Sequence, residues 1–386
     1  MLGRRGGILV PMATADAEVA IVGTGTMGSM AAWQLAKRGV RVLAFEQFAP
    51  AHDRGAAGGE SRIFRTAYFE DPDYVPILLQ AQRGWRELEQ ESGRQLLTMN
   101  GGLTIGRDGS PFVANVLESV QTYGLAHEIL TSREAAERWP QHCLNPDDLV
   151  VLDKQAGFLR PEAAVLCAAR MALEHGAQIK EHCRIQAIQP DRDQVEIQAD
   201  GQIYRVRRAI ITGGAWAGCL LPSLAPLIKP RRIFTTWWPA LDPSRFAPER
   251  FPIFIREQGE MHVYGIPTID GEGVKLGLVA QGGFGHDPDH LDLEVASEDL
   301  SEISELVRHW VRGLHPEPCR IGAYQDGYSP DQHPILGQAS TPSLLFACGF
   351  SGHGFKMAPA IGTILADLVV EGRTELPISH LSPTRF

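Results

Sequence analysis

Residues 19–46 read VAIVGTGTMGSMAAWQLAKRGVRVLAFE, and this stretch decides the fold of the chain. Val19 to Val22 form a short apolar run, which is typical of a strand buried in a parallel sheet. A glycine-rich turn follows, then a predicted helix from Met30 to Arg38 and a second predicted strand from Val40 to Glu46. Strand, helix and strand within about thirty residues make one βαβ unit. The sequence therefore predicts an α/β fold that contains a Rossmann-like domain.

The glycines of this stretch, Gly23, Gly25 and Gly28, have the spacing GxGxxG between strand and helix. The first glycine forms the turn, the second lets the backbone approach a pyrophosphate, and the third lets the helix pack on the strand. The helix N-terminus adds free N–H groups. Glu46 ends the next predicted strand, and a carboxylate there accepts hydrogen bonds from ribose hydroxyls. Its negative charge argues against a 2′-phosphate and therefore against NADP. We predict a bound dinucleotide, contacted also by Thr26, Met27 and Gln47; a purely structural turn is the alternative.

Two distant segments suggest which dinucleotide this is. Ile210–Trp216 is a second strand that runs into a glycine turn, with Gly213 and Trp216 in that turn. A third turn near the C-terminus opens a helix and contains Gly349, Gly352, His353, Gly354 and Lys356. Extra glycine turns suit a flavin held between separated segments better than an NAD bound to one continuous domain. Ordinary loops between strands and helices are the alternative.

Composition excludes several classes of function. The net charge is −10, without a visible basic patch, which argues against a nucleic-acid substrate. No apolar run is long enough to span a membrane, and the six scattered cysteines show no metal-ligand spacing, so we assign no metal site. Free thiols are typical of a reducing, cytoplasmic location. Residues 1–15 are expected to form a disordered tail rather than a secretion signal.

The rest of the chain predicts further elements. We expect helices at 73–93, capped by Asp73, within 110–140, at 161–175, at 297–313 and at 357–370, and strands at 101–106, 179–188, 208–212 and 344–347. Residues 195–199 and 203–206 flank Asp200-Gly201 and predict a hairpin. The segment 229–318 is rich in predicted strands. The nucleotide domain is therefore assembled from pieces that are separated in the sequence.

Several cations are candidates for binding and catalysis. Arg62 and Arg65 lie in an apolar segment, where an arginine can clamp a carboxylate in a bidentate way; surface ion pairing is the alternative. Lys356 lies at a helix start and could face a developing negative charge; a solvated lysine is the alternative. Tyr264 and Lys275 are equidistant from the centre of a predicted hairpin, so they could face each other, although a lysine between Val274 and Leu276 is more often the outward-pointing residue of an alternating strand.

Together these segments resemble the monomeric sarcosine oxidase family, which includes N-methyltryptophan, pipecolate and fructosyl amino-acid oxidases. The resemblance covers residues 18–382 and rests on VAIVGTGTMGSMAAWQLAKRG, GESRIFRTAY, DYVP, GGAW, VYGIP, GVKLG and GFSGHGFKMAP. It implies a discontinuous FAD domain of the glutathione-reductase type and an antiparallel, α+β substrate domain. We expect the FAD domain to comprise 16–92, 155–228 and 320–386, and the substrate domain 93–154 and 229–319.

The resemblance also implies an activity. Family members oxidise the carbon–nitrogen bond of a small amine or amino acid by hydride transfer to flavin N5; the imine hydrolyses and oxygen becomes hydrogen peroxide. By position, Arg65 and Lys356 look like the substrate carboxylate clamp, Lys275 like the oxygen-activating cation and Tyr264 like a pocket residue. Flavin contacts are also expected from Ser61 and Arg62. The expected partners are therefore a small amino acid and O2, with no nucleic acid and no membrane, in a monomer or small homo-oligomer.

Two positions depart from the family. The cysteine that tethers the flavin is replaced by Tyr324, and Cys319, five residues earlier, should point to the opposite face of an extended strand. We therefore expect non-covalent FAD. Val279 replaces a histidine that contacts small substrates, so sarcosine itself is in doubt; Trp237 and Trp238 could build a larger pocket or simply be core. A secondary amino acid is the favoured substrate. A primary amino acid, a fructosyl amine, or a dehydrogenase with a carrier as acceptor are the alternatives.

Overall fold

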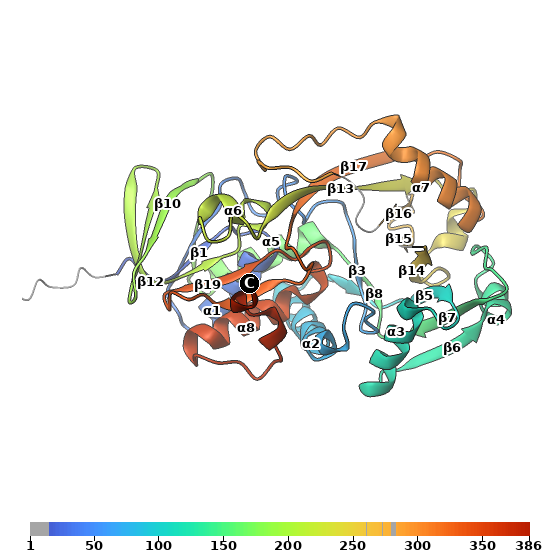
Figure 1. Ribbon diagram of the computed structural model, residues 1–386, viewed down its shortest axis with the longest axis horizontal. Coiled ribbons are helices and arrows are strands. Elements are labelled where there is room, and N and C mark those ends of the chain that lie inside the picture. Colours follow the sequence, from blue (N-terminus) through green and yellow to red (C-terminus); the bar gives the residue numbers. More distant parts are fainter. Residues whose placement is uncertain (1–14, 260, 272, 279–282) are drawn as a thin grey trace, which may run out of the picture.

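Two eight-stranded sheets, joined side by side, form the body of the molecule (Figure 1). The computed structural model describes residues 15–259, 261–271, 273–278 and 283–386. The expected N-terminal tail, apart from Ala15, and Val279 lie outside these ranges. The first sheet belongs to the part of the chain with the glycine turns, and the second sheet lies beside it (Figure 1). This arrangement confirms the α/β fold class with a second, sheet-based domain.

The βαβ unit lies at the centre of the first sheet. β1 (Ala17–Val22) pairs in parallel with β2 (Val42–Phe45) on one side and with β12 (Gln202–Ile211) on the other. β12 also pairs in parallel with β19 (Leu344–Cys348), and β18 (Ile335–Gln338) completes that side. The helix between β1 and β2, α1 (Thr26–Lys37), starts four residues earlier than expected because Gly25 already serves as its N-cap.

Four helices cover one face of this sheet. α1 packs against both α5 (Pro161–Glu174) and α8 (Ala358–Val370), and α2 (Val75–Ser92) packs against α8. The helical expectations for these segments are confirmed, but Asp73 does not cap the helix: the N-cap of α2 is Tyr74, which makes no side-chain capping hydrogen bond. The Asp71 carboxylate accepts from the Asp73 N–H and caps a 3-10 turn, η1 (Pro72–Tyr74), that precedes α2. One continuous apolar core forms between these helices and the sheet.

The single strand predicted at 179–188 is wrong. The segment divides into β9 (Gln178–Lys180), which pairs with β2, and β10 (Ile185–Pro190), which pairs with β11 (Val195–Ala199) at the opposite edge. The chain turns between them, and His182 there has a φ of 53°, which ends an extended strand. Conversely, two predicted strands form one long strand, β12: the strand at 203–206, which is the second strand of the predicted hairpin, and the strand at 208–212.

The second sheet is ordered β17-β13-β16-β15-β14-β5-β7-β6. Its strands are β5 (Gly102–Arg107), β6 (His127–Thr131), β7 (Asp148–Asp153), β13 (Lys229–Trp238), β14 (Ile253–Gln258), β15 (Met261–Ile266), β16 (Val274–Leu278) and β17 (Arg320–Tyr328). All neighbours are antiparallel except β14 and β5. β6 separates α3 (Pro111–Thr122) from α4 (Ser132–Arg138), where only a turn was expected. α7 (Ser297–Trp310) lies between β16 and β17 in the sequence.

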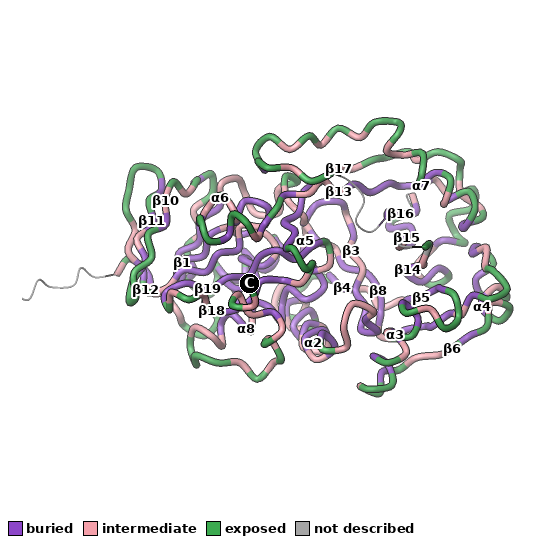
Figure 2. The backbone as a smooth tube through the Cα atoms, viewed as in Figure 1, coloured by how far each residue is buried: buried purple, intermediate pink, exposed green. Residues whose placement is uncertain are grey.

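The sheets do not follow one of the expected domain limits. β17 forms a ladder with β13 along residues 320–328, so it belongs to the second sheet although we assigned 320–386 to the FAD domain. A small third sheet of β3 (Arg62–Phe64), β8 (Gly157–Leu159) and β4 (Leu97–Thr98) lies apart from both. Figure 2 shows buried backbone running through the middle of both halves and exposed backbone at the rims. Among the described residues, no helix is long and apolar enough to cross a membrane.

Candidate active site

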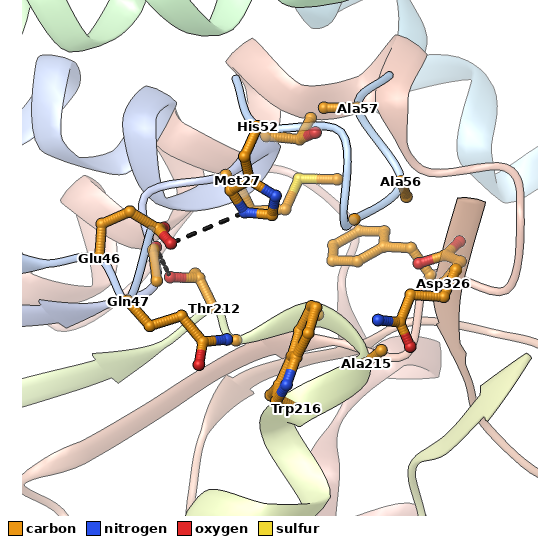
Figure 3. A pocket seen from close by; sticks show the side chains of 18 of the residues that line it. Met27, Glu46, Gln47, His52, Ala56, Ala57, Thr212, Ala215, Trp216 and Asp326 are labelled. Atoms are coloured by element: carbon orange, nitrogen blue, oxygen red, sulfur yellow. Dashed lines mark hydrogen bonds and ion pairs between the residues drawn. The ribbon is translucent and has the colours of Figure 1, made fainter. Parts of the chain in front are cut away.

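A cavity follows the carboxyl ends of β1, β2 and β12, where the three glycine turns meet. Its lining includes eleven of the predicted cofactor residues: Gly23, Gly25, Thr26, Met27, Glu46, Gln47, Arg62, Gly213, Trp216, Gly352 and Gly354. Figure 3 shows Met27 and His52 on one side of this cavity and the Trp216 ring on the other. Segments from three distant parts of the sequence therefore form one elongated site.

The glycines of the first turn differ in what surrounds them. A Cβ on Gly28 would lie 1.8 Å from the Gly23 carbonyl oxygen, and one on Gly23 would lie 2.9 Å from the Thr212 carbonyl oxygen. Gly28 therefore serves the packing of α1 on β1 and does not line the cavity. A Cβ on Gly25 would meet no protein atom within 4 Å, although Gly25 lines the cavity. This open space beside the α1 N-terminus is where a pyrophosphate could approach the backbone.

Glu46 is held in place at the end of β2. Its buried carboxylate accepts hydrogen bonds from the Thr24 N–H at 2.8 Å and the Phe48 N–H at 3.0 Å. The His52 Nε2 lies 3.6 Å from a carboxylate oxygen of Glu46. Burial lowers the pKa of His52, although the charge of Glu46 opposes this effect, so the imidazole adds little positive charge. A fixed carboxylate on this strand end fits a ribose diol.

A second cavity of about 520 Å³ adjoins the first. Arg62, Ile233, Gly352 and Phe355 line both cavities. The second cavity lies between the C-terminal glycine turn and the face of the second sheet, and it contains every predicted catalytic residue, namely Arg65, Tyr264, Lys275 and Lys356, together with Ser61 and His353. Gly349 lines neither cavity; its φ of 67° forms the turn after β19. The fold thus brings the residues predicted to be catalytic together in one cavity.

Arg65 is engaged with an acidic residue that sequence reasoning missed. Its guanidinium donates to both carboxylate oxygens of Glu70, at 2.7 and 2.6 Å, and to the Ala67 carbonyl at 3.1 Å. Although burial opposes ionisation, Arg65 keeps the pKa of Glu70 below its usual value. The Arg65 Nε is buried and has no hydrogen-bond partner among the described residues. The one sequence signal for this pair was a glutamate five residues after the arginine.

Lys356 lies close to this pair and is buried by the C-terminal turn. Its Nζ donates to the His353 carbonyl at 2.6 Å and to the Tyr68 hydroxyl at 3.4 Å. Burial, with Arg65 nearby, lowers the pKa of Lys356 to about 7. The solvated-lysine alternative is therefore wrong. A buried cation with a pKa near neutrality is well suited to bind an incoming carboxylate.

His353 belongs to the second cavity and not to the first. Its Nε2 lies 2.9 Å from the Gln332 carbonyl, which can only accept, so Nε2 carries the proton. Burial lowers the pKa of His353 to about 4 and keeps the ring neutral, so its Nδ1 accepts from the Tyr68 hydroxyl at 2.7 Å. Tyr68, another residue the sequence reading missed, thereby connects His353 with Lys356.

Lys275 points inward from β16. Its buried Nζ donates to the carbonyls of Gly59 and Ser61, both at 2.8 Å. Lys275 pairs with Ile266 and Tyr264 pairs with Gly277, so the two side chains are diagonal neighbours on one face and do not face each other directly. Arg62, at the junction of the cavities, donates to the carbonyls of Ala56, Gly58 and Ser61. Among the described residues it has no ion-pair partner.

The tether position is occupied by a tyrosine that is packed in place. Tyr324 lines the second cavity, and a Cβ on Gly58 would lie 2.3 Å from its ring. Cys319 lies before β17, is exposed and lines neither cavity; its backbone N–H donates to the Trp237 carbonyl. Trp237 and Trp238 are buried, and neither lines the second cavity, so the core interpretation holds for both.

Comparisons with known proteins agree with this geometry. Residues 18–368 match the family described as FAD dependent oxidoreductase, and the chain belongs to that family. It is 36% identical over 377 residues to a monomeric sarcosine oxidase of Streptomyces avermitilis, covering 96% of this chain and 97% of that relative. It is 30% identical over 385 residues to an N-methyl-L-tryptophan oxidase of Yersinia pestis, covering 96% and 100%.

Solved structures show the same fold. The amino acid oxidase NikD superposes with a TM-score of 0.82 at 22% identity, over 95% of this chain and 97% of that one. Glycine oxidase from Geobacillus kaustophilus gives a TM-score of 0.80 at 21% identity, over 97% and 100%. The family and the full-length relatives make this protein an FAD-dependent oxidoreductase that acts on CH–NH bonds and is similar to sarcosine oxidases.

Proposed function

We propose that the protein oxidises a secondary amino acid, N-methylated or cyclic, and reduces O2 to H2O2. The observation that carries this proposal is the gathering of Arg65, Lys356 and Lys275 in one cavity that adjoins the dinucleotide cavity. Flavin supplies the redox chemistry when bound: it accepts hydride from the substrate carbon and returns two electrons to oxygen. The names of the full-length relatives, sarcosine oxidase and N-methyl-L-tryptophan oxidase, favour a methylated amine.

The side chains of this chain would first bind the substrate carboxylate. Lys356 contributes a buried ammonium, and Arg65 contributes a guanidinium whose Nε lacks a partner in the described part of the chain. A buried donor of this kind normally finds a partner in a ligand or water. Glu70 already holds the other edge of Arg65, which fixes the direction of the free N–H. The amine can then lie over the junction of the cavities.

Lys275 would serve the second half of the reaction. A buried ammonium near the junction stabilises negative charge that develops on oxygen when the first electron arrives. Its two carbonyl partners hold the ammonium in place without neutralising it. This role favours an oxidase over a dehydrogenase that reacts with a carrier.

We propose further that FAD is held without a covalent bond. Support comes from the burial of Tyr324, whose hydroxyl lies close to Gly322 on the same strand, and from the exposed position of Cys319 outside both cavities. Acid precipitation of the purified protein is expected to leave a colourless pellet and a yellow supernatant. A yellow pellet would contradict this proposal, and loss of that colour in Cys319→Ser would identify the cysteine as the tether.

An anaerobic screen tests the substrate proposal. N-methyl, cyclic, primary and glycated amino acids are mixed in turn with the yellow enzyme, and bleaching near 450 nm is followed by stopped flow. We expect N-methyl or cyclic amino acids to bleach the flavin fastest, and admission of air to restore the colour with stoichiometric H2O2. Bleaching by primary or glycated amino acids alone would replace the proposed substrate class, and slow recovery in air would identify a dehydrogenase.

A further inference from the structure

The carbonyls that hold Lys275 belong to a strained segment of the chain. Gly59 has a φ of 97° and Glu60 a φ of 69°, so two consecutive residues lie in the left-handed region, which is unfavourable for a glutamate. The Gly59 and Ser61 carbonyls on either side of Glu60 accept from the Lys275 Nζ. Such a segment keeps its shape only if other groups hold it. The position of Lys275 therefore depends on whatever fixes residues 59–61.

Glu162 is the group that holds this segment from outside. One oxygen, Oε1, accepts from the Gly59 N–H at 2.7 Å and from the Glu60 N–H at 2.9 Å. Glu162 is the second residue of α5, and its acidic side chain suits the first turn of that helix. Gly59 thus donates its N–H to Glu162 while its carbonyl accepts from Lys275. Only one peptide segment separates the carboxylate from the ammonium.

We propose that Glu162 is a positioning residue for Lys275: it fixes the segment whose carbonyls orient the Lys275 amine and places a negative charge close to that amine. The inference rests on the proposed function, because Lys275 has its oxygen-activating role only there. Glu162 belongs to neither cavity lining, so it acts through the backbone and not by touching substrate.

The charges around Lys275 explain why a carboxylate is needed there. Burial is the main reason why the pKa of Lys275 lies well below its usual value. The positive charge of the neighbouring Arg62 is the next largest cause, and Arg320 acts in the same direction. Glu162 and Glu60 oppose this effect. On β13, the uncharged Trp237 packs its ring 5.3 Å from Nζ and donates to Glu60 at 2.6 Å. On β17, Tyr324 remains neutral because burial raises its pKa.

Glu162→Gln is the direct test, since glutamine keeps an acceptor oxygen at the same position and removes the charge. Glu174→Gln is the matched control: Glu174 lies at the other end of α5, is exposed, and forms an ion pair with Arg170 at 3.6 Å. The first readout is carbamylation of Lys275 by cyanate, which attacks the neutral amine, in the holoenzyme across pH. At a pH below the inflection we expect Glu162→Gln to be labelled about three- to tenfold faster, because loss of the nearby carboxylate lowers the pKa of Lys275 and enlarges the fraction of neutral amine.

The second readout separates the half-reactions. In Glu162→Gln, the pH at which reoxidation by O2 slows should move downward, while anaerobic bleaching by substrate stays within about twofold because the substrate clamp is untouched. Glu162→Asp keeps the charge but shortens the side chain, so it should slow reoxidation with little change of the inflection. Glu174→Gln should behave as the wild type in every measurement.

Two outcomes distinguish the inference from the proposed function. If Glu162→Gln matches the wild type in labelling and in the reoxidation profile while Lys275→Met slows reoxidation, the inference is overturned and the proposed function stands. If Lys275→Met reoxidises as fast as the wild type, the proposed role of Lys275 in activating oxygen is overturned. Cyanate labelling then still decides whether Glu162 controls the protonation of Lys275.

Discussion

Replacing Gly28 with alanine is expected to destabilise the protein itself, whereas alanine at Gly25 is expected to weaken only FAD binding. The new Cβ at position 28 would lie 1.8 Å from the Gly23 carbonyl oxygen, which is backbone and cannot move aside without shifting β1 from α1. Overpacking of this kind typically costs about 1–3 kcal/mol and sometimes more. Because the overlap is with backbone, we expect the upper end, about 3 kcal/mol.

The same methyl group at position 25 meets no protein atom within 4 Å. The expected cost to the apoprotein is at most about 1 kcal/mol, the typical difference between glycine and alanine at a helix N-cap. The methyl group does occupy the open space beside the α1 N-terminus, where the pyrophosphate would approach the backbone. Gly25→Ala should therefore bind FAD at least about tenfold more weakly, which corresponds to about 1.4 kcal/mol.

Two measurements on each variant separate these effects. Thermal unfolding of the apoprotein should show a fall of roughly 6 °C for Gly28→Ala and 2 °C or less for Gly25→Ala, at about 2 °C per kcal/mol for a chain of this size. Titration of apoprotein with FAD, followed by flavin fluorescence, measures affinity. Equal loss of apoprotein stability in both variants, or wild-type FAD affinity in Gly25→Ala, would show that the open space beside Gly25 does not receive the cofactor.

Three further results are expected. Because the pKa of Lys356 is about 7, its ammonium is present below that pH and lost above it. The dissociation constant of a carboxylate inhibitor should therefore rise as pH increases through 7. Flavin difference spectra measure this constant, and Lys356→Met should remove its pH dependence. Arg65→Ala should raise KM by about 30- to 160-fold, as loss of a charge-assisted hydrogen bond of about 2–3 kcal/mol implies; an unchanged KM in steady-state assays would argue against the clamp. Asp289 accepts from the indole N–H of Trp216 at 2.8 Å, and Trp216 lines the dinucleotide cavity. Asp289→Ala should therefore release FAD faster on dilution. An unchanged release rate would show that this hydrogen bond does not help to retain FAD.

The location of the site was readable from the sequence because local rules determine it. GxGxxG between an apolar run and a helix specifies a turn that only glycine can form, and the strand that follows places Glu46 at a known edge of the sheet. The C-terminal glycine turn was identified in the same way, and Lys356 follows it directly. These inferences need only neighbouring residues, so they did not require knowledge of the tertiary structure.

Contacts between distant segments could not be read in this way. A glutamate five residues after Arg65 is too weak a signal to predict that Arg65 and Glu70 form a buried ion pair. The hydrogen bonds that the Gly59 and Glu60 N–H groups donate to Glu162 join positions about a hundred apart in the sequence. The register of β15 and β16 depends on a turn whose length the pattern did not determine, which is why Tyr264 and Lys275 are diagonal rather than opposite.

The sequence by itself determined that this chain forms an α/β dinucleotide-binding fold and indicated candidate residues for its chemistry, because glycine geometry, strand burial and helix starts are properties of short segments. The tertiary structure alone decided the protonation and partners of those residues. Lys356, His353 and Lys275 are ordinary side chains in the sequence. Their pKa values fall because packing removes water from them and brings the cations Arg62 and Arg65 within reach, while Glu70 opposes this fall at Lys356 and His353.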